Sequence, residues 1–562
     1  MPAVGIAPIS IWSKIEGPTL PRRRGESPER LGLSEMHNLL TQPLLDTAPH
    51  GPLSLPGLLA ALARDEVEGF PALRPHQAPG WHMFLVQLAA LALHGAGRRE
   101  VPEDAAAWAE LLRGLTPGFA ADEPWSLVVD DWTRPALLQP PVPEGVTLGN
   151  AVPSADALDL LITSRNHDLK QAVARNGQPE DWVFALVSLQ TGEGYGGAGN
   201  QGIARMNGGS SSRCLLALAP LPEQVGKTMT PRPGAWFRRD VAVLLETRDA
   251  ELHAHDHLEY PETGGLGLTW LAPWPERQQL QTAELDIWFI EVCRRIRLQQ
   301  QGETLSARKG TSKATRINAK HLNGVLGDPY APVNKVESKS FTLAGRDFDY
   351  GTLTELILSG NWDTPLLDPP AAFEREGETL ALVAQALARG NSKTEGFKSR
   401  ILPIGGKVPH ALGARRAELH ELAQAQVKAI ERFHKALGYA LALTAAGGDR
   451  DRIKRDHYGH ARDAQRRFDR AADTIFFPHL WDRFDAQEKG DDALKAEEKR
   501  FARALFHEAR AVFEAALPAV PCAGIFRPRA EARAERAFLG AIWRDFPEVR
   551  ETPDREESED VA

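Results

Sequence analysis

The end of the chain carries a helical pattern that limits the possible fold more than any other feature of the sequence. Segments rich in Ala, Leu, Arg, Glu and Lys repeat apolar residues three and four apart, over 411–446, 452–477, 494–516 and 530–546. Gly447-Gly448, Gly490 and the stretch 518–521 separate these segments and are typical helix breaks. The spacing predicts a C-terminal four-helix bundle over residues 405–548.

The chain before residue 405 has a mixed pattern. Helical spacing of apolar residues recurs over 53–63, 81–94 and 102–112. From residue 126 to about 360, short apolar runs such as 127–129 and 182–189 are broken by Gly, Pro and Asn, which is typical of buried strands or short helices. We therefore expect an α+β fold, in which a large mixed domain over 36–404 precedes the bundle.

The two ends differ from the rest of the chain. Residues 1–35 have no usable apolar period, so we expect an irregular extension there. Residues 551–560 contain six acids and one arginine. This composition predicts an acidic, disordered tail over 549–562.

Composition excludes several classes of protein. Apolar residues make up 42% of the 562 residues and charged residues 25%, which is typical of globular chains and not of disordered or collagen-like ones. No apolar run reaches ~18 residues and no secretory signal is recognisable, so we expect a cytoplasmic protein. Cys214, Cys293 and Cys522 lie far apart without a C-x-x-C pair, which argues against disulfides and a cysteine-bound zinc.

The formal net charge of −9 conceals two basic islands. Each has a local sum of +5: the first spans 305–340 and the second 393–416. In the second, Lys393, Lys398 and Arg400 could neutralise phosphates while Phe397 packs or stacks. A solvated basic turn with Phe397 in the core explains the same residues equally well.

A glycine-rich segment over 190–212 is the most unusual part of the sequence. Gly194, Gly196 and Gly199 satisfy G-x-G-x-x-G, so a dinucleotide-dependent enzyme is one interpretation. The following Asn207-Gly208-Gly209 would break the helix that such a site opens, and no lysine completes a P-loop. Glycines at this density let backbone N–H groups approach a ligand closely, whereas a plain connection between core elements is the alternative.

Catalytic and metal-binding patterns are weak. His253, His255 and His257 would share one face of a strand and could ligate a metal, but a solvated acidic loop explains them as well. Neither a G-x-S-x-G elbow nor an H-E-x-x-H helix occurs in the sequence. The residues therefore nominate a binding protein before an enzyme, and a helical scaffold without nucleic-acid contact is a third possibility.

Several pieces together resemble one family, the CasA-type large subunit of the type I-E CRISPR Cascade complex. They occur in the family's order from about 36 to 546: the start at 37–45, the glycine segment with Arg205 and Gly208-Gly209, the step Leu322-Asn323-Gly324, the segment 393–396 and the closing helices. The resemblance implies a large mixed domain followed by a four-helix bundle, which agrees with the pattern break near residue 405.

The resemblance also implies a non-catalytic function without a cofactor. Such a subunit recognises the protospacer-adjacent motif (PAM) in double-stranded DNA, helps to start unwinding and R-loop formation, and supports recruitment of a helicase-nuclease in antiviral defence. Its partners are the crRNA-guided Cascade subunits, the target duplex and the displaced single strand.

Residue by residue, the resemblance assigns DNA contacts to three places. The family's glycine loop falls on Gly194, Tyr195, Gly196 and Gly197, and a preceding DNA-facing loop falls near Arg165, Asn166 and Lys170. A basic finger before Asn323-Gly324 comes from Lys313, Arg316 or Lys320, and we expect Arg316. The family's strand-separating wedge falls near 361–365, where no glutamine stands. The zinc that some members carry has no matching cysteines here, so we expect no metal.

Overall fold

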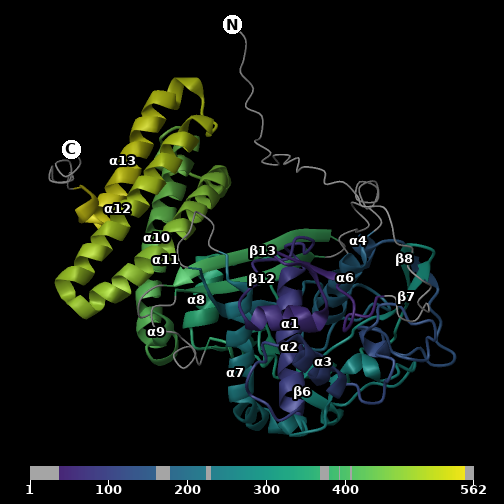
Figure 1. Cartoon of the computed structure of the whole chain (residues 1–562). Helices are drawn as coiled ribbons and strands as arrows, with labels where there is room; N and C mark the ends of the chain where they lie inside the picture. Colours follow the sequence, from purple (N-terminus) through teal and green to yellow (C-terminus); the bar gives the residue numbers. More distant parts are fainter. Residues whose placement is uncertain are drawn as a thin grey trace, which may run out of the picture.

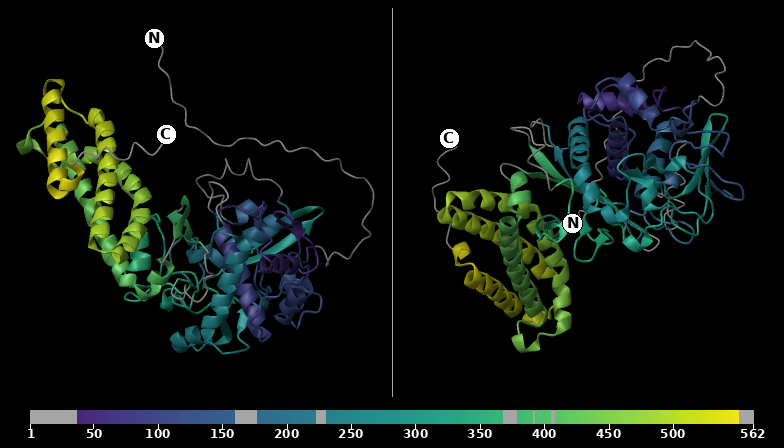
Figure 2. Two further views of the ribbon diagram at one scale, coloured as in Figure 1. Left: turned by 60° about the vertical axis from the view of Figure 1, so that its left-hand side comes forward. Right: turned by 90° about the horizontal axis from the view of Figure 1, so that it is seen from below.

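The structure is a computed structural model that describes residues 37–159, 177–222, 230–367, 379–390, 393–404 and 408–550. A mixed part lies beside an elongated helical part, and the two meet near the strands of a central sheet (Figures 1 and 2). The extension 1–35 and the tail beyond Arg550 lie outside the described residues. None of the described helices is long and apolar enough to cross a membrane.

Residues 55–254 contain a series of α-helices in the mixed part. They are α1 (Leu55–Ala63), α2 (Ala78–Gly95), α3 (Ala105–Gly114), α4 (Ala155–Leu158), α6 (Pro179–Gly192) and α7 (Pro233–Ala254). Ser54 caps α1 by accepting the Gly57 N–H, and Asp104 caps α3 by accepting the Ala107 N–H. The helices expected over 53–63, 81–94 and 102–112 are thus confirmed.

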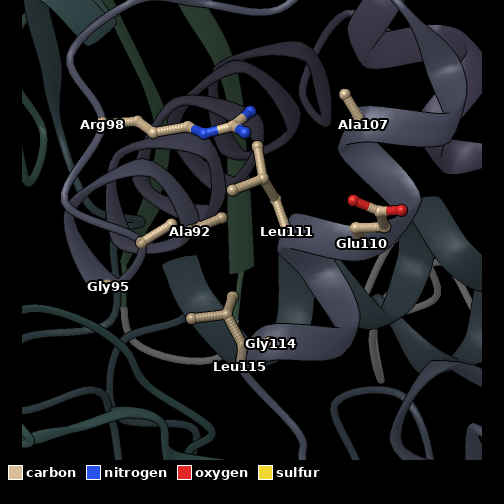
Figure 3. Close-up of a pocket in the computed structure, with 9 residues that line it drawn as sticks. Ala92, Gly95, Arg98, Ala107, Glu110, Leu111, Gly114 and Leu115 are labelled. Atoms are coloured by element: carbon tan, nitrogen blue, oxygen red, sulfur yellow. The ribbon is translucent and has the colours of Figure 1, made fainter.

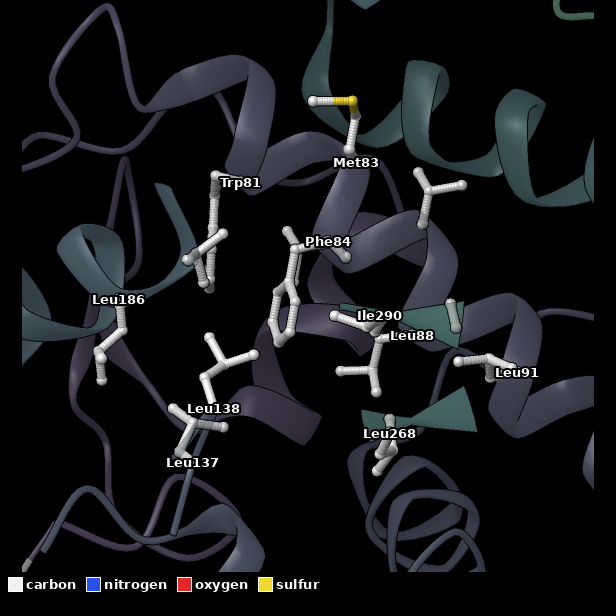
Figure 4. Close-up of a cluster of buried hydrophobic side chains, with 14 of the residues drawn as sticks. Trp81, Met83, Phe84, Leu88, Leu91, Leu137, Leu138, Leu186, Leu268 and Ile290 are labelled. Atoms are coloured by element: carbon white, nitrogen blue, oxygen red, sulfur yellow. The ribbon is translucent and has the colours of Figure 1, made fainter. Parts of the chain in front are cut away.

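Helix α2 is the centre of the first hydrophobic core. Its residues are buried on nearly every side, since α6, α7 and strand β6 (Leu285–Ile290) pack around it. The Trp81 ring stacks on Phe84 with centroids 5.7 Å apart and meets Phe184 edge-on at 5.0 Å. Figure 4 shows Leu88, Leu138 and Ile290 around the same cluster.

Short sheets complete the mixed part. Strand β8 (Thr304–Gly310) pairs with β7 (Arg295–Gln301) and β3 (Asn150–Val152). Strand β9 (Val333–Asn334) pairs with β10 (Lys339–Ser340) and β11 (Trp362–Asp363). The two-stranded pairs are β1 (Leu45–Thr47) with β2 (Gly51–Leu53) and, in parallel, β5 (Leu266–Leu268) with β6.

A third three-stranded sheet, β13-β12-β4, separates two cores. It consists of β4 (Leu215–Pro220), β12 (Leu380–Gly390) and β13 (Lys393–Ile404), all antiparallel. Because side chains alternate along a strand, Leu215 of β4 and Val383 of β12 enter the first core, whereas Leu216 and Leu382 enter the second. The second core continues into α8 (Tyr350–Leu358) and the bundle.

The bundle consists of α10 (Arg416–Ala445), α11 (Arg462–Lys489), α12 (Asp491–Ala516) and α13 (Arg527–Asp545), preceded by α9 (Val408–Ala414). Phe513 stacks on Phe538 with centroids 4.6 Å apart. The expected α+β class and helical C-terminal part are confirmed. Residue 405 falls between β13 and α9, but the division into domains stays a prediction, since one core spans the junction.

The bounds of the bundle helices differ from the expectation. The segment expected over 411–446 is divided between α9 and α10, and the second helix differs at both ends. The segment expected over 452–477 begins later, at Arg462, after a turn of 3-10 helix over Arg455–Ala461. It then continues through Pro478, because Leu480 and Phe484 extend its buried face. The helix ends at Gly490, whose φ of 110° favours glycine.

Candidate nucleic-acid interface

The glycine loop, residues 193–212, connects α6 to the segment before β4 and folds back on its own backbone. The Tyr195 N–H donates to the Gly209 carbonyl over 2.7 Å, and the Ile203 N–H donates to the Glu193 carbonyl over 3.0 Å. A Cβ at Gly194 would lie 2.6 Å from two carbonyl oxygens. A Cβ at Gly202 would lie 2.8 Å from the backbone at 194 and 195. Gly194 and Gly202 are therefore required for close packing.

The loop lines a cleft that is open to solvent. Gly194 is buried, but Tyr195 is 46% exposed, and Gly196 and Ala198 are exposed. The cleft has a volume of about 700 Å³, and its other lining residues come from the loop and from Gln279, Lys313, Ala314, Thr315, Asn318, Lys320 and Asn323. The loop thus lies beside two exposed lysines of the first basic island, as the sequence interpretation requires.

The lysine-bearing segment is attached directly to the glycine loop. The Ser312 N–H donates to the Gly199 carbonyl over 2.9 Å. The same glycine passes so close to Thr311 that a Cβ at Gly199 would lie 2.6 Å from the threonine Cβ. Lys313 follows at once, so its backbone has a fixed position relative to the loop.

Two other pieces quoted for the resemblance also meet at this cleft. A Cβ at Gly324 would lie 2.8 Å from the Met206 carbonyl carbon, so the Asn323-Gly324 step rests on the glycine loop. Asn323 and Gly324 have φ values of 50° and 82°, in the left-handed region. Arg205 is buried and donates to the Ile287 carbonyl over 2.8 Å, which makes it an anchor of the loop and not a DNA contact.

Buried charges lie beneath the loop. The Glu193 carboxylate pairs with Arg389, while both oxygens of Glu291 accept the Ala204 N–H at 2.8 Å. Burial raises the pKa of Glu193 and of Glu291 to about 7 each. Arg294 donates to the Gly194 carbonyl over 3.0 Å. Sequence reasoning missed these residues, because each contacts its partner across 87 to 196 positions of the chain.

The preference for Arg316 as the basic finger does not fit the structure. Arg316 is 1% exposed, stacks on Trp274 and donates to the carbonyls of Pro273 and Ala272 over 3.0 and 2.8 Å. Desolvation lowers its pKa to about 10. A guanidinium held by backbone carbonyls in the core cannot reach DNA, so Lys313 and Lys320 are the exposed candidates.

The second basic island is largely neutralised by acids from elsewhere in the chain. Lys398 pairs with Asp347 at 2.5 Å, and Arg400 pairs with Asp473 of α11. A cleft of about 670 Å³ beside them is also lined by Asp349 and Asp469. The local sum of +5 therefore overstates the positive charge at this place.

The remaining assigned residues cannot be placed. Arg165, Asn166 and Lys170 lie outside the described residues, and only the backbone of Lys393 is described.

The segment expected to hold the wedge contains β11, where Trp362 is buried against Phe341. The structure therefore nominates no wedge residue there.

The alternative sites find little support. The glycine loop follows a helix and leads to strand β4, whereas a dinucleotide-binding loop leads from a strand into a helix. His253 and His255 lie at the end of α7, with His257 in a 3-10 turn, so no strand aligns them. In the described part of the chain one metal-type cluster occurs, His479, Asp482 and Glu497, and Arg500 pairs with both of its carboxylates.

A smaller cleft of about 350 Å³ lies between α2 and α3 (Figure 3). Small and apolar residues line most of it, and Arg98 and Glu110 are its charged members. It contains no residue of the glycine loop or of either basic island.

Comparisons with known proteins support the fold. No family model matches the chain, and no curated protein does. Solved structures match over nearly their whole length, among them Thermobifida fusca Cse1, with a TM-score of 0.58, 15% identity and coverage of 92% of this chain and 98% of that one. This chain has the CasA fold. Thermus thermophilus CasA gives a TM-score of 0.57 at 14% identity, covering 91% and 100% of the two chains.

A third CasA-fold structure, CRISPR-associated protein Cse1 from Acidimicrobium ferrooxidans, gives a TM-score of 0.56 at 16% identity and covers 91% and 99%. The match extends across both the mixed part and the bundle, as the coverage requires. The resemblance drawn from ordered motifs is thus confirmed at the level of the CasA fold, although identity is too low to align single residues by sequence.

Proposed function

We propose that this chain is the large subunit of a type I-E Cascade complex and recognises the PAM in double-stranded DNA without catalysis. The observation that carries the proposal is the exposed glycine loop in a cleft with Lys313 and Lys320. A CasA fold over nine-tenths of the chain supports the same assignment. In this function the subunit helps to start unwinding and R-loop formation and supports recruitment of the helicase-nuclease.

The cleft has the composition of a nucleic-acid contact. Two lysines supply positive charge, while Asn207, Asn318 and Asn323 supply carboxamides that can donate to or accept from base edges. The net charge of −9 over the whole chain disfavours binding of DNA elsewhere on its surface. We therefore expect weak DNA binding by the chain alone and strong binding in the guide-loaded complex.

Reconstitution with the backbone subunits and a crRNA tests the proposal. The complex should bind a target duplex with a PAM more tightly than the same duplex with an altered PAM, and omission of this chain should abolish the difference. A complex that discriminates PAMs equally well without this chain would refute it. Saturable binding of NAD or ATP, with no effect on the complex, would favour the enzyme alternative.

A further inference from the structure

Two helices of the bundle bring one histidine and two carboxylates together. His479 and Asp482 lie three residues apart on α11, so they share one face of that helix. Glu497 lies on α12, which packs against α11 (Figure 1). One potential ligand atom of each residue, a ring nitrogen or a carboxylate oxygen, lies within 4.8 Å of the other two. Metal sites in helical bundles are built in this way, from side chains on facing helices.

Two atoms of this cluster are buried without a hydrogen bond. They are Nδ1 of His479 and Oε2 of Glu497, and neither has a partner among the residues that the structure describes. A buried polar atom without a partner is costly, and such atoms in a native protein are often explained by an ion. The His479 ring also packs against Phe501, with centroids 5.3 Å apart, so one of its faces is held by the bundle.

Arg500 uses only one oxygen of each carboxylate. It pairs with Oδ2 of Asp482 and with Oε1 of Glu497, the latter over 3.0 Å. In the described part of the chain, the second oxygen of each carboxylate accepts no hydrogen bond. The Arg500 side chain is 57% exposed. It can therefore turn into water at little cost, since ion pairs as exposed as this one contribute little to stability.

The chemistry of the three groups selects the ion. Mg²⁺ and Ca²⁺ prefer oxygen ligands, whereas an imidazole combined with carboxylates suits Zn²⁺. Ligand atoms at about 2.0–2.2 Å from a tetrahedral zinc lie roughly 3.4 Å apart, so the three side chains would have to close by about 1 Å. Three protein ligands leave the fourth position of the ion to water.

We propose that His479, Asp482 and Glu497 bind one zinc ion, which links α11 to α12. Arg500 is then the cation that balances the two carboxylates until zinc displaces it. The site contains no cysteine, so it differs from the cysteine-bound zinc that the resemblance brought into question. It also departs from the expectation of no metal, which rested on missing cysteines. The inference does not depend on the proposed function, because it concerns the chain alone.

Titration of the full chain with zinc chloride tests the proposal, after treatment with a chelator and without an affinity tag. Calorimetry should show saturable binding of one ion per chain, and saturating zinc should raise the melting temperature, because a ligand that binds only the folded state stabilises it. Magnesium and calcium at the same concentration should do neither. Equal stabilisation by these two ions would overturn the assignment to zinc.

Three variants locate the ion. Glu497→Gln and His479→Ala each remove one ligand, so each should weaken zinc binding by about tenfold or more. His507→Ala is the matched control, since it removes an exposed histidine of α12 outside the cluster, and it should bind like wild type. Zinc binding that persists in both cluster variants, or that all three variants weaken equally, would overturn the site. Circular dichroism without zinc checks that each variant is folded.

Arg500→Ala distinguishes a metal site from a plain network of ion pairs. Without zinc, the variant should melt at a lower temperature than wild type, because two carboxylates lose their countercharge. It should nevertheless bind zinc about tenfold more tightly, since the ion no longer competes with a guanidinium for the same carboxylates. Weaker zinc binding than wild type, or a lowered melting temperature that zinc does not restore, would show that the cluster is only an ion-pair network.

Discussion

The carboxylate of Asp473 on α11 pairs with the guanidinium of Arg400 on β13, across the junction between the bundle and the β13-β12-β4 sheet. Its other oxygen accepts the N–H of Tyr350, the first residue of α8, over 2.6 Å. One side chain thus joins three elements that lie far apart in the sequence. It also explains why the second basic island carries little free charge.

Asp473→Asn should destabilise the protein by about 1–3 kcal/mol, because it leaves a partly buried guanidinium without its countercharge. Chemical denaturation monitored by circular dichroism measures the change. Glu514→Gln is the matched control, since its pair with Arg510 on α12 is more than half exposed and should contribute about 0–0.5 kcal/mol. Similar values for the two variants would contradict the importance of the junction.

Gly202→Ala should destabilise the glycine loop, because the new methyl group would lie 2.8 Å from backbone atoms that cannot turn away. We expect a loss of about 1–3 kcal/mol in the free energy of unfolding and weaker binding of PAM duplexes. Gly149→Ala, where no atom lies within 4 Å of the new Cβ, should change neither. An unchanged melting temperature for Gly202→Ala would refute the backbone-on-backbone packing described above.

The buried carboxyl of Glu193 should make stability depend on pH. Its pKa is about 7 in the folded protein against an ordinary 4.5, so the folded state binds a proton more tightly than the unfolded state does. Its contribution to stability therefore falls as the pH rises from about 4.5 to 7 and is constant above. The free energy of unfolding of Glu193→Gln minus that of wild type should therefore be larger at about pH 8 than at about pH 5.

Denaturation of both proteins at the two pH values measures this difference. Glu291 has a similarly raised pKa, but it is present in both proteins, so its contribution cancels in the comparison. A difference between variant and wild type that stays constant with pH would show that Glu193 is already ionised in the folded state below neutral pH.

Lys313→Ala and Lys320→Ala should each weaken duplex binding by the complex and reduce the dependence on salt by about one counterion, while leaving the melting temperature unchanged. Arg316→Ala should instead lower stability, by about 2–4 kcal/mol, because it removes the donors to three carbonyls. Its effect on the salt dependence of binding should be small. Binding isotherms at several salt concentrations and thermal melts distinguish the two behaviours. If only Arg316→Ala reduced the salt dependence of binding, Arg316 and not a lysine would be the basic finger.

The sequence predicted those parts of the fold that depend on local pattern. The bundle follows from apolar residues three and four apart, and Gly490 ends α11 where a break was expected. The start of α11 was misplaced, because residues 455–461, which were expected to be α-helical, form a 3-10 turn. The exposed glycine loop beside Lys313 was anticipated from composition and the order of motifs.

Partners distant in sequence could not be predicted. A count of charges does not tell whether a side chain points outward, which is why Arg316 was preferred although its guanidinium lies in the core. The acids that neutralise Lys398 and Arg400 lie 51 and 73 residues away along the chain. Arg294 gives no signal in the sequence, because the carbonyl that it contacts belongs to Gly194, a hundred residues earlier.

Strand β12 has one end hydrogen-bonded to the glycine loop and one face in the core of the bundle. The Leu387 carbonyl accepts the Ser212 N–H of the glycine loop over 2.9 Å, while Leu382 packs in the second core. One continuous backbone therefore connects the glycine loop to the core of the bundle. If a ligand at the loop displaced this strand, the bundle helices packed on it would be displaced too, and by reciprocity a protein bound to those helices would change affinity at the loop.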